Sequence, residues 1–225
     1  MLDEHFDTTG PADPGEARAF EARARARLLA EPPGAPTRED PLAGHGDHRL
    51  SPGLIDPEAA LRARAAAVLV PVVDRAKGAA LLLTKRAAHL RTHAGQIAFP
   101  GGRIDPEDAS VLDAALREAE EEVGLDRGLV RLIGYGDAYL SGSGFHIIPV
   151  VALVEPAYRL VINRDEVEEA FEVPLSSLMT PGNHERRMRE HRGGMREAWA
   201  MPHGERVIWG VTAGIIRSLY ERIYA

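Results

Sequence analysis

The clearest hydrophobic pattern in the chain lies between residues 110 and 123. Its apolar positions recur at about helical spacing, at Leu112, Leu116, Ala119 and Val123. Either Asp108 or Ser110 can cap the first turn by accepting a hydrogen bond from a free backbone amide, and Gly124 provides a left-handed stop. We therefore predict a helix over 110–123 that packs through one apolar face.

Continuous apolar runs predict several buried strands. Residues 65–73 form a valine-rich run without glycine, and residues 74–78 turn the chain into a second strand at 80–84. After the helix, segments 129–139 and 145–154 have the composition of two further strands. The strands at 65–73 and 80–84 should lie at the centre of a sheet.

The C-terminal part mixes polar and apolar segments. Residues 180–196 are polar and arginine-rich, and we predict a mobile loop over a cleft. Residues 197–201 and 205–208 flank a Pro-His-Gly turn and predict a hairpin, and a final helix at 209–223 has one apolar stripe. This order of strands and helices predicts an α/β fold, an α/β/α sandwich with a mixed central sheet.

The first 56 residues differ in composition from the rest. Residues 15–31 are rich in helix formers, whereas the proline and glycine residues between 32 and 57 disfavour regular structure. We therefore divide the chain into an N-terminal extension, 1–56, and a catalytic domain, 57–225. The arginine face of the first helix has two interpretations, an ordinary solvated face or a contact to substrate phosphate or a second subunit.

Composition excludes several classes of function. The 27 Lys and Arg residues against 34 Asp and Glu give a formal charge of −7, without a basic block, which argues against nucleic-acid binding as the main activity. The chain has no cysteine, no apolar run of the roughly 18 residues that a membrane span needs, and an N-terminus unlike a secretory signal. We expect a cytoplasmic protein with a small-molecule partner and no membrane partner.

Three carboxylates crowd one face of the predicted helix. Glu118, Glu121 and Glu122 are spaced at i, i+3 and i+4, where each like-charge pair costs a helix roughly 0.2–0.5 kcal/mol. Such a cluster suggests a compensating cation, and hard oxygen ligands suit Mg²⁺ or Mn²⁺ with a diphosphate substrate. An ordinary solvated glutamate face is the alternative.

The wider motif resembles a known family. Residues 117–125, Arg-Glu-Ala-Glu-Glu-Glu-Val-Gly-Leu, match the core of the Nudix box at every defined position. Residues 82–102, with Leu-Leu-Thr-Lys-Arg, Arg91, Gly95 and Phe-Pro-Gly-Gly, resemble the signature of coenzyme A diphosphatases within that family. Weaker likeness extends from about residue 62 to the C-terminus. The chain is thus identified as a member of the Nudix hydrolases, whose α/β/α fold agrees with the predicted elements.

One spacing departs from the general Nudix box. Fourteen residues separate Gly102 from Arg117, so that Glu107 and Asp108 lie one residue out of register with the acidic position that the box usually carries. The coenzyme A branch tends to show this longer spacing as well. We therefore count neither residue as a metal ligand.

The resemblance implies roles for individual residues. Glu118, Glu121 and Glu122 would hold Mg²⁺ or Mn²⁺, and Arg117 would orient a neighbouring carboxylate. Nudix enzymes often draw another carboxylate from outside the box, for which Glu166 is the candidate, with Glu168 and Glu169 as alternatives. The base that deprotonates the attacking water is left open among Glu121, Glu122 and Glu166.

The loop before the box supplies candidate substrate contacts. Arg86 and Arg91 could bind the diphosphate or the 3′-phosphate of coenzyme A, or either could brace the box helix through a carboxylate. Gly101 and Gly102 form a sharp turn that allows close backbone approach to a diphosphate. The histidines His89 and His93 are interpreted as structural or substrate-edge residues rather than metal ligands.

The expected reaction is metal-dependent hydrolysis of coenzyme A to 4′-phosphopantetheine and adenosine 3′,5′-bisphosphate. One alternative is a Nudix hydrolase acting on ADP-ribose or a dinucleotide. Another, from a different class, is a catalytically silent ligand-binding protein, which would be expected to have lost a box carboxylate, whereas this chain keeps all three. The sequence leaves the oligomeric state open, with a homodimer among the alternatives.

Overall fold

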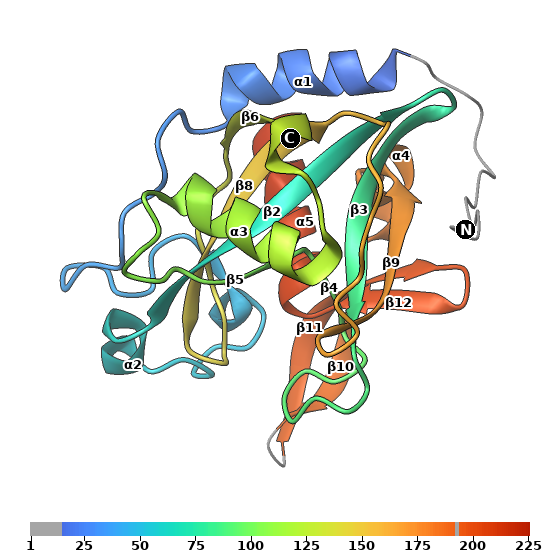
Figure 1. Cartoon of the computed structure of the whole chain (residues 1–225). Helices are drawn as coiled ribbons and strands as arrows, with labels where there is room; N and C mark the ends of the chain where they lie inside the picture. The colour runs from blue at the N-terminus through green and yellow to red at the C-terminus, as the bar shows by residue number, and fades with distance from the viewer. Residues whose placement is uncertain (1–14, 192–193) are drawn as a thin grey trace.

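The computed structural model describes residues 15–191 and 194–225, and the expectations for residues 1–14 and for 192–193 lie outside that part (Figure 1). The helices are α1 (Glu16–Arg27), α2 (Pro57–Leu61), α3 (Val111–Val123), α4 (Leu175–Leu178) and α5 (Val211–Tyr224). The strands are β1 (His45–Gly46), β2 (Arg64–Arg75), β3 (Gly78–Arg86), β4 (Ile97–Ala98), β5 (Gly101–Arg103), β6 (Val130–Tyr135), β7 (Tyr139–Leu140), β8 (Phe145–Val154), β9 (Val167–Pro174), β10 (Glu185–His191), β11 (Gly194–His203) and β12 (Arg206–Trp209).

The main sheet is mixed, as predicted. Its central path runs β1-β7-β8-β2-β3-β4, while β5, β6 and β9 pair with β2, β8 and β3 respectively. The long strands β2 and β8 are parallel to each other, whereas β3 pairs antiparallel with both β2 and β9. A second, antiparallel sheet contains β10, β11 and β12.

Helices cover both faces of the main sheet, which confirms the α/β/α sandwich. Strand β2 is buried on both sides: Val70 and Val72 pack with α1 and α5, whereas Leu69 and Val73 pack on the face covered by α3. In Figure 1, α3 lies in front of the sheet and α5 behind it. The continuous valine-rich run that predicted a buried strand follows from this double burial.

Local signals determine the bounds of α3. The Ser110 hydroxyl accepts a hydrogen bond from the Asp113 amide at 3.0 Å, and Gly124 ends the helix in the left-handed conformation with φ +66°. Ala114, Ala115, Ala119 and Val123 are buried on the sheet side. The helix predicted over 110–123 is therefore confirmed to within one residue.

Helix α1 contributes to the main core. Ala17, Phe20 and Ala24 are buried with α5 and the sheet, and Phe20 is 3% exposed. The helix ends at Arg27, earlier than the predicted residue 31, because Leu29 forms a β-bridge with Tyr135. The proline-rich segment after it is also more ordered than expected, since β1 pairs with β7 and Asp56 caps the short helix α2.

The predicted mobile loop at 180–196 is wrong for its described residues. Strand β10 pairs with β11 from Glu185 opposite Ala200 to His191 opposite Gly194. The segment is polar because β10 is an edge strand with much of its surface exposed, so it lacks the apolar alternation by which buried strands are recognised. Strand β9 was also not predicted. Among residues 15–191 and 194–225, no helix combines the length and the apolar character that a bilayer span requires.

Candidate active site

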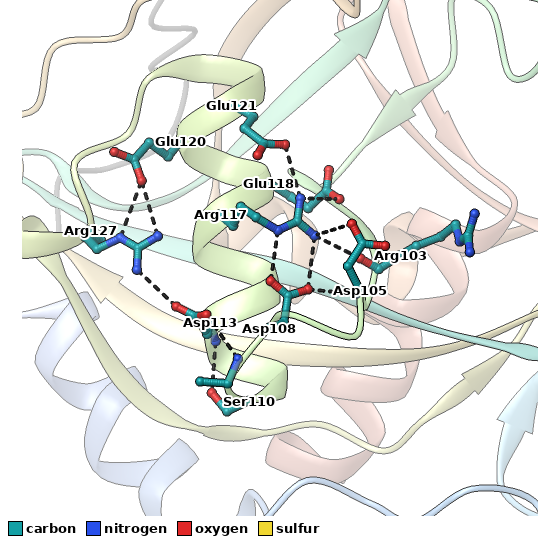
Figure 2. A network of polar contacts seen from close by, with 11 residues as sticks. Arg103, Asp105, Asp108, Ser110, Asp113, Arg117, Glu118, Glu120, Glu121 and Arg127 are labelled. Carbon is teal, nitrogen blue, oxygen red and sulfur yellow. Dashed lines mark hydrogen bonds and ion pairs between the residues drawn. The ribbon is translucent and has the colours of Figure 1, made fainter.

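Arg117 is the centre of a polar network beside the N-terminal half of α3 (Figure 2). Its guanidinium donates to both carboxylate oxygens of Asp108, at 2.9 and 3.1 Å, and to the Arg103 carbonyl at 3.1 Å. One further nitrogen, Nη1, lies 3.1 Å from both a Glu118 and a Glu121 oxygen. Arg117 therefore holds two of the three box carboxylates on one side of α3.

Asp108 anchors this arginine. Its side chain is 3% exposed, and the hydrogen bonds from Arg117 hold the pKa of the Asp108 carboxyl below its ordinary value. The Asp105 amide also donates to it at 2.8 Å. The sequence offered Asp108 as an alternative helix cap but not as the partner of Arg117, because an acidic residue nine positions before an arginine has no helical or strand period.

Glu122 occupies a different environment from Glu121. The Glu122 side chain is 3% exposed, and burial raises its pKa to about 8, although Arg86 acts in the opposite direction. Its Oε1 lies 3.8 Å from Arg86 Nη1, whereas its Oε2 is buried without a hydrogen-bond partner. A buried carboxylate oxygen without a hydrogen-bond partner lowers the stability of the folded protein unless a cation or a hydrogen-bond donor approaches it.

Glu118 and Glu166 lie close to Glu122. Burial raises the pKa of Glu118, and the charges of Glu118 and Glu166 both act to raise the pKa of Glu122. Glu166 is positioned from outside the box, because its backbone carbonyl accepts from Ala87 at 2.9 Å. Its predicted alternatives are directed elsewhere: Glu168 pairs with Lys85, and Glu169 pairs with Arg206.

These carboxylates fit a divalent cation in their chemistry. They supply only hard oxygen donors, they repel one another, and Glu122 Oε2 has no partner. Among residues 15–191 and 194–225, however, no three Asp, Glu or His side chains converge closely enough to hold an ion together. Two of the box carboxylates, Glu118 and Glu121, are instead bound by the Arg117 guanidinium.

Gly101 and Gly102 of the turn each lack room for a side chain, but for different steric reasons. Gly101 has φ +154°, and a methyl group there would collide with the Ala67 carbonyl and lie 2.6 Å from Val68 Cα. A methyl group at Gly102 would instead meet the Glu118 carboxylate at 2.5 Å. Gly101 thus allows β5 to pair with β2, and Gly102 leaves the space that the Glu118 carboxylate fills.

The two arginines predicted to contact the substrate, Arg86 at the end of β3 and Arg91 in the loop that follows, have different surroundings. Arg86 points to Glu122, which is the bracing arrangement considered for it, whereas Arg91 is exposed and makes no hydrogen bond or ion pair with any described residue. His89 Nε2 contacts the Asp165 carbonyl at 3.1 Å, and His93 Nδ1 contacts Gln96 Oε1 at 2.9 Å. Both histidines therefore have partners within the protein.

Comparison with known proteins agrees with the motifs. The family profile described as "NUDIX domain" matches residues 63–197. The chain is 45% identical over 163 residues to the "Uncharacterized Nudix hydrolase NudL" of Citrobacter koseri, covering 72% of this chain and 84% of that protein. The protein of the same name from Escherichia coli O1:K1 is 44% identical over the same shares.

Solved structures show a weaker likeness. The Ap4A hydrolase binary complex of C. elegans has 20% identity and a TM-score of 0.43, covering 49% of this chain and 80% of that one. The Nudix hydrolase RenU of M. smegmatis has 24% identity and a TM-score of 0.41, covering 51% and 72%. Similarity at TM-scores of 0.43 and 0.41 does not indicate which substrate the chain binds.

Proposed function

The chain belongs to the Nudix hydrolase family, and from this membership we propose that it hydrolyses the diphosphate bond of coenzyme A to 4′-phosphopantetheine and adenosine 3′,5′-bisphosphate. Members of the family are hydrolases of pyrophosphate bonds in nucleoside diphosphate derivatives. The choice of coenzyme A rests on residues 82–102, which resemble the signature of coenzyme A diphosphatases. Acylated or oxidised forms of the coenzyme carry the same bond and are further candidate substrates.

The observation that carries the proposed chemistry is the state of Glu122. It is a buried carboxylate with an unpartnered oxygen, next to Glu118 and Glu166, on the helix that bears the box. Glu118, Glu121 and Glu122 would hold Mg²⁺ or Mn²⁺. A divalent cation bound there would neutralise charge on the diphosphate and lower the pKa of a coordinated water.

Side chains of the protein would accept the proton of the attacking water and hold the carboxylates in position. The attacking water bonds to one phosphorus, the bridging P–O bond breaks, and a carboxylate among Glu121, Glu122 and Glu166 accepts the proton of the water. Arg117 holds Glu118 and Glu121 in position and is itself fixed by Asp108.

The two loop arginines have separate parts in this proposal. Arg86 balances the charge of Glu122, at 3.8 Å. Arg91, exposed in the same loop, is available for a phosphate oxygen of the substrate, because no described residue occupies its guanidinium. Replacing Arg91 by Ala should therefore raise KM for the coenzyme, whereas an unchanged KM would assign it no contact.

Product analysis tests the substrate. The protein is incubated with coenzyme A, ADP-ribose and a diadenosine polyphosphate, each with Mg²⁺, Mn²⁺ or excess chelator, and the products are separated by chromatography. We expect 4′-phosphopantetheine and adenosine 3′,5′-bisphosphate only with metal, and the highest kcat/KM for coenzyme A. A higher kcat/KM for another dinucleotide would overturn the substrate, and absence of any turnover would favour the ligand-binding alternative.

A further inference from the structure

A cleft that is distinct from the carboxylate site lies against strands β10, β11 and β12. It has a volume of about 120 Å³, is open to solvent, and is lined by residues from the loop before β4, the glycine loop after β7, and strands β10, β11 and β12. None of the carboxylates Glu118, Glu121, Glu122 and Glu166 lines it. Residues Arg189, Arg196 and Trp209 give the cleft its chemical character.

The two arginines face each other across a strand pair. Arg189 of β10 is directly opposite Arg196 of β11 in the antiparallel register, where like charges destabilise pairing. The Arg189 guanidinium lies 4.8 Å from the centre of the Trp209 ring, which stabilises its position. Arg196 Nε is buried and has no hydrogen-bond partner. An anion bound between these two cations would reduce their repulsion and could accept from the unpaired Arg196 donor.

The acidic residues of the cleft do not provide this anion. Both oxygens of Asp47 already accept hydrogen bonds at 2.7 Å, one from the Tyr139 hydroxyl and one from the Gly142 amide. Glu197 lies 3.7 Å from Arg186, which is outside the cleft, and Glu190 is exposed. In the described part of the chain, neither Arg189 nor Arg196 forms an ion pair with a carboxylate.

The cleft is connected to the carboxylate site through one loop. Gln96 lines the cleft, and its carbonyl accepts a hydrogen bond from the Arg86 amide at 2.9 Å. The Arg86 carbonyl in turn accepts from Gly95 at 3.0 Å, and the Arg86 side chain points to Glu122. The same loop therefore contributes residues to the cleft and to the surroundings of Glu122.

We propose that this cleft binds a phosphomonoester group carried by the substrate at a distance from the scissile diphosphate, with Arg189 and Arg196 as the specificity residues. Guanidinium groups match phosphate oxygens in a bidentate fork, and a phosphate dianion would satisfy both cations and the free Arg196 donor together. The inference rests on the proposed function for the identity of the substrate, whose 3′-phosphate is such a group. Binding of a phosphate group in the cleft and hydrolysis of coenzyme A can be measured separately.

The test measures binding and hydrolysis with matched ligands. Calorimetry compares adenosine 3′,5′-bisphosphate with adenosine 5′-monophosphate in the presence of Mg²⁺, and kinetics compares coenzyme A with 3′-dephospho-coenzyme A. The variants are Arg189→Gln, Arg196→Gln and Arg196→Lys. The control is Arg187→Gln, because Arg187 is on the same strand, pairs with Glu185 and does not line the cleft. Thermal unfolding checks that every variant is folded.

We expect the wild-type protein and Arg187→Gln to bind the bisphosphate about tenfold or more tightly than the monophosphate. Both glutamine variants should lose most of this preference with unchanged monophosphate affinity, and Arg196→Lys should keep part of it. A preference that persists in Arg189→Gln and in either Arg196 variant would overturn the inference, as would equal wild-type affinities. If the arginine-dependent preference is found but coenzyme A is not hydrolysed, the proposed substrate fails and the phosphate site stands.

Discussion

The variant Gly102→Ala should displace one carboxylate of the candidate site while leaving the stability of the fold nearly unchanged. Gly102 needs no left-handed backbone, and the three atoms nearest to an added methyl group all belong to the Glu118 carboxylate, at 2.5–2.6 Å. To restore a separation of 3.0–3.4 Å, that carboxylate must move by about 0.5–0.9 Å. Because Glu118 ends a flexible side chain, it can yield, but it then leaves the position that Arg117 and the neighbouring backbone define.

A displacement of this size should lower activity and leave stability nearly unchanged. Misplacement of a catalytic group by about 1 Å can cost about 100-fold in rate, so we expect kcat/KM to fall by about 10- to 100-fold. The free energy of unfolding should change by no more than about 1 kcal/mol. Gly101→Ala should do the opposite and cost more than about 2 kcal/mol, because its contacts are to the backbone of β2 and its φ is +154°.

The assays are kcat/KM by product chromatography, Mn²⁺ affinity by electron paramagnetic resonance of the free ion, and urea denaturation. Gly182→Ala is the control, since nothing lies within 4 Å of the added methyl group. Shortening the neighbour with Glu118→Asp should cost less activity in the Gly102→Ala background than in the wild type. Unchanged kcat/KM and Mn²⁺ affinity in Gly102→Ala would refute the steric reasoning, and so would a loss of stability equal to that of Gly101→Ala.

Three further predictions concern the core and the carboxylates. Phe20→Ala should lower the free energy of unfolding by about 3–5 kcal/mol in urea, because Phe20 is buried against α5, and a loss below about 1 kcal/mol would show that α1 does not belong to the folded unit. Asp108→Asn should lower the melting temperature at pH 7 and should lower it less at pH 3. The reason is that Arg117 lowers the pKa of Asp108, so that the stabilisation is present above the ordinary value near 4 and is lost as the pH falls through the lowered folded value; an equal effect at both pH values would contradict this. Glu122→Gln should abolish turnover and also the stabilisation that bound Mn²⁺ gives to the fold. For an ion at 100 times its Kd, this stabilisation amounts to about 2.7 kcal/mol. If Mn²⁺ still raises the melting temperature of the variant, the ion binds elsewhere.

Local signals predicted the elements that depend on local contacts. Helix α3 was placed correctly because Ser110 and Gly124 mark its ends, and the central strands because β2 is buried on both faces. The hairpin of β10 and β11 was missed because six of the seven residues of β10 are polar, so the strand shows no alternation of polar and apolar side chains. The buried face of α1 was not recognised because two of its three members are alanines among arginines.

The candidate site could be predicted in its residues but not in its contacts. The helical period placed Glu118, Glu121 and Glu122 on one face, yet it could not show that Glu122 is buried while Glu121 is exposed, because that depends on the sheet beneath α3. The Asp108–Arg117 pair and the opposed arginines Arg189 and Arg196 arise from loop geometry and strand register. Neither follows from a periodic pattern.

The packing of α1 on α5 has a consequence for how the polypeptide is made. Arg222 donates to the Arg27 carbonyl at 2.9 Å, and Arg27 donates to the Ala225 carbonyl at 3.0 Å, so segments from opposite ends of the sequence are in contact. During synthesis, residues 16–27 leave the ribosome long before 211–224 exist. Until then Phe20 and the apolar side of the sheet lack their cover, which is a state prone to aggregation. This layer can therefore be completed only after translation of the last helix, which makes the nascent chain a candidate client for chaperones that bind exposed apolar segments.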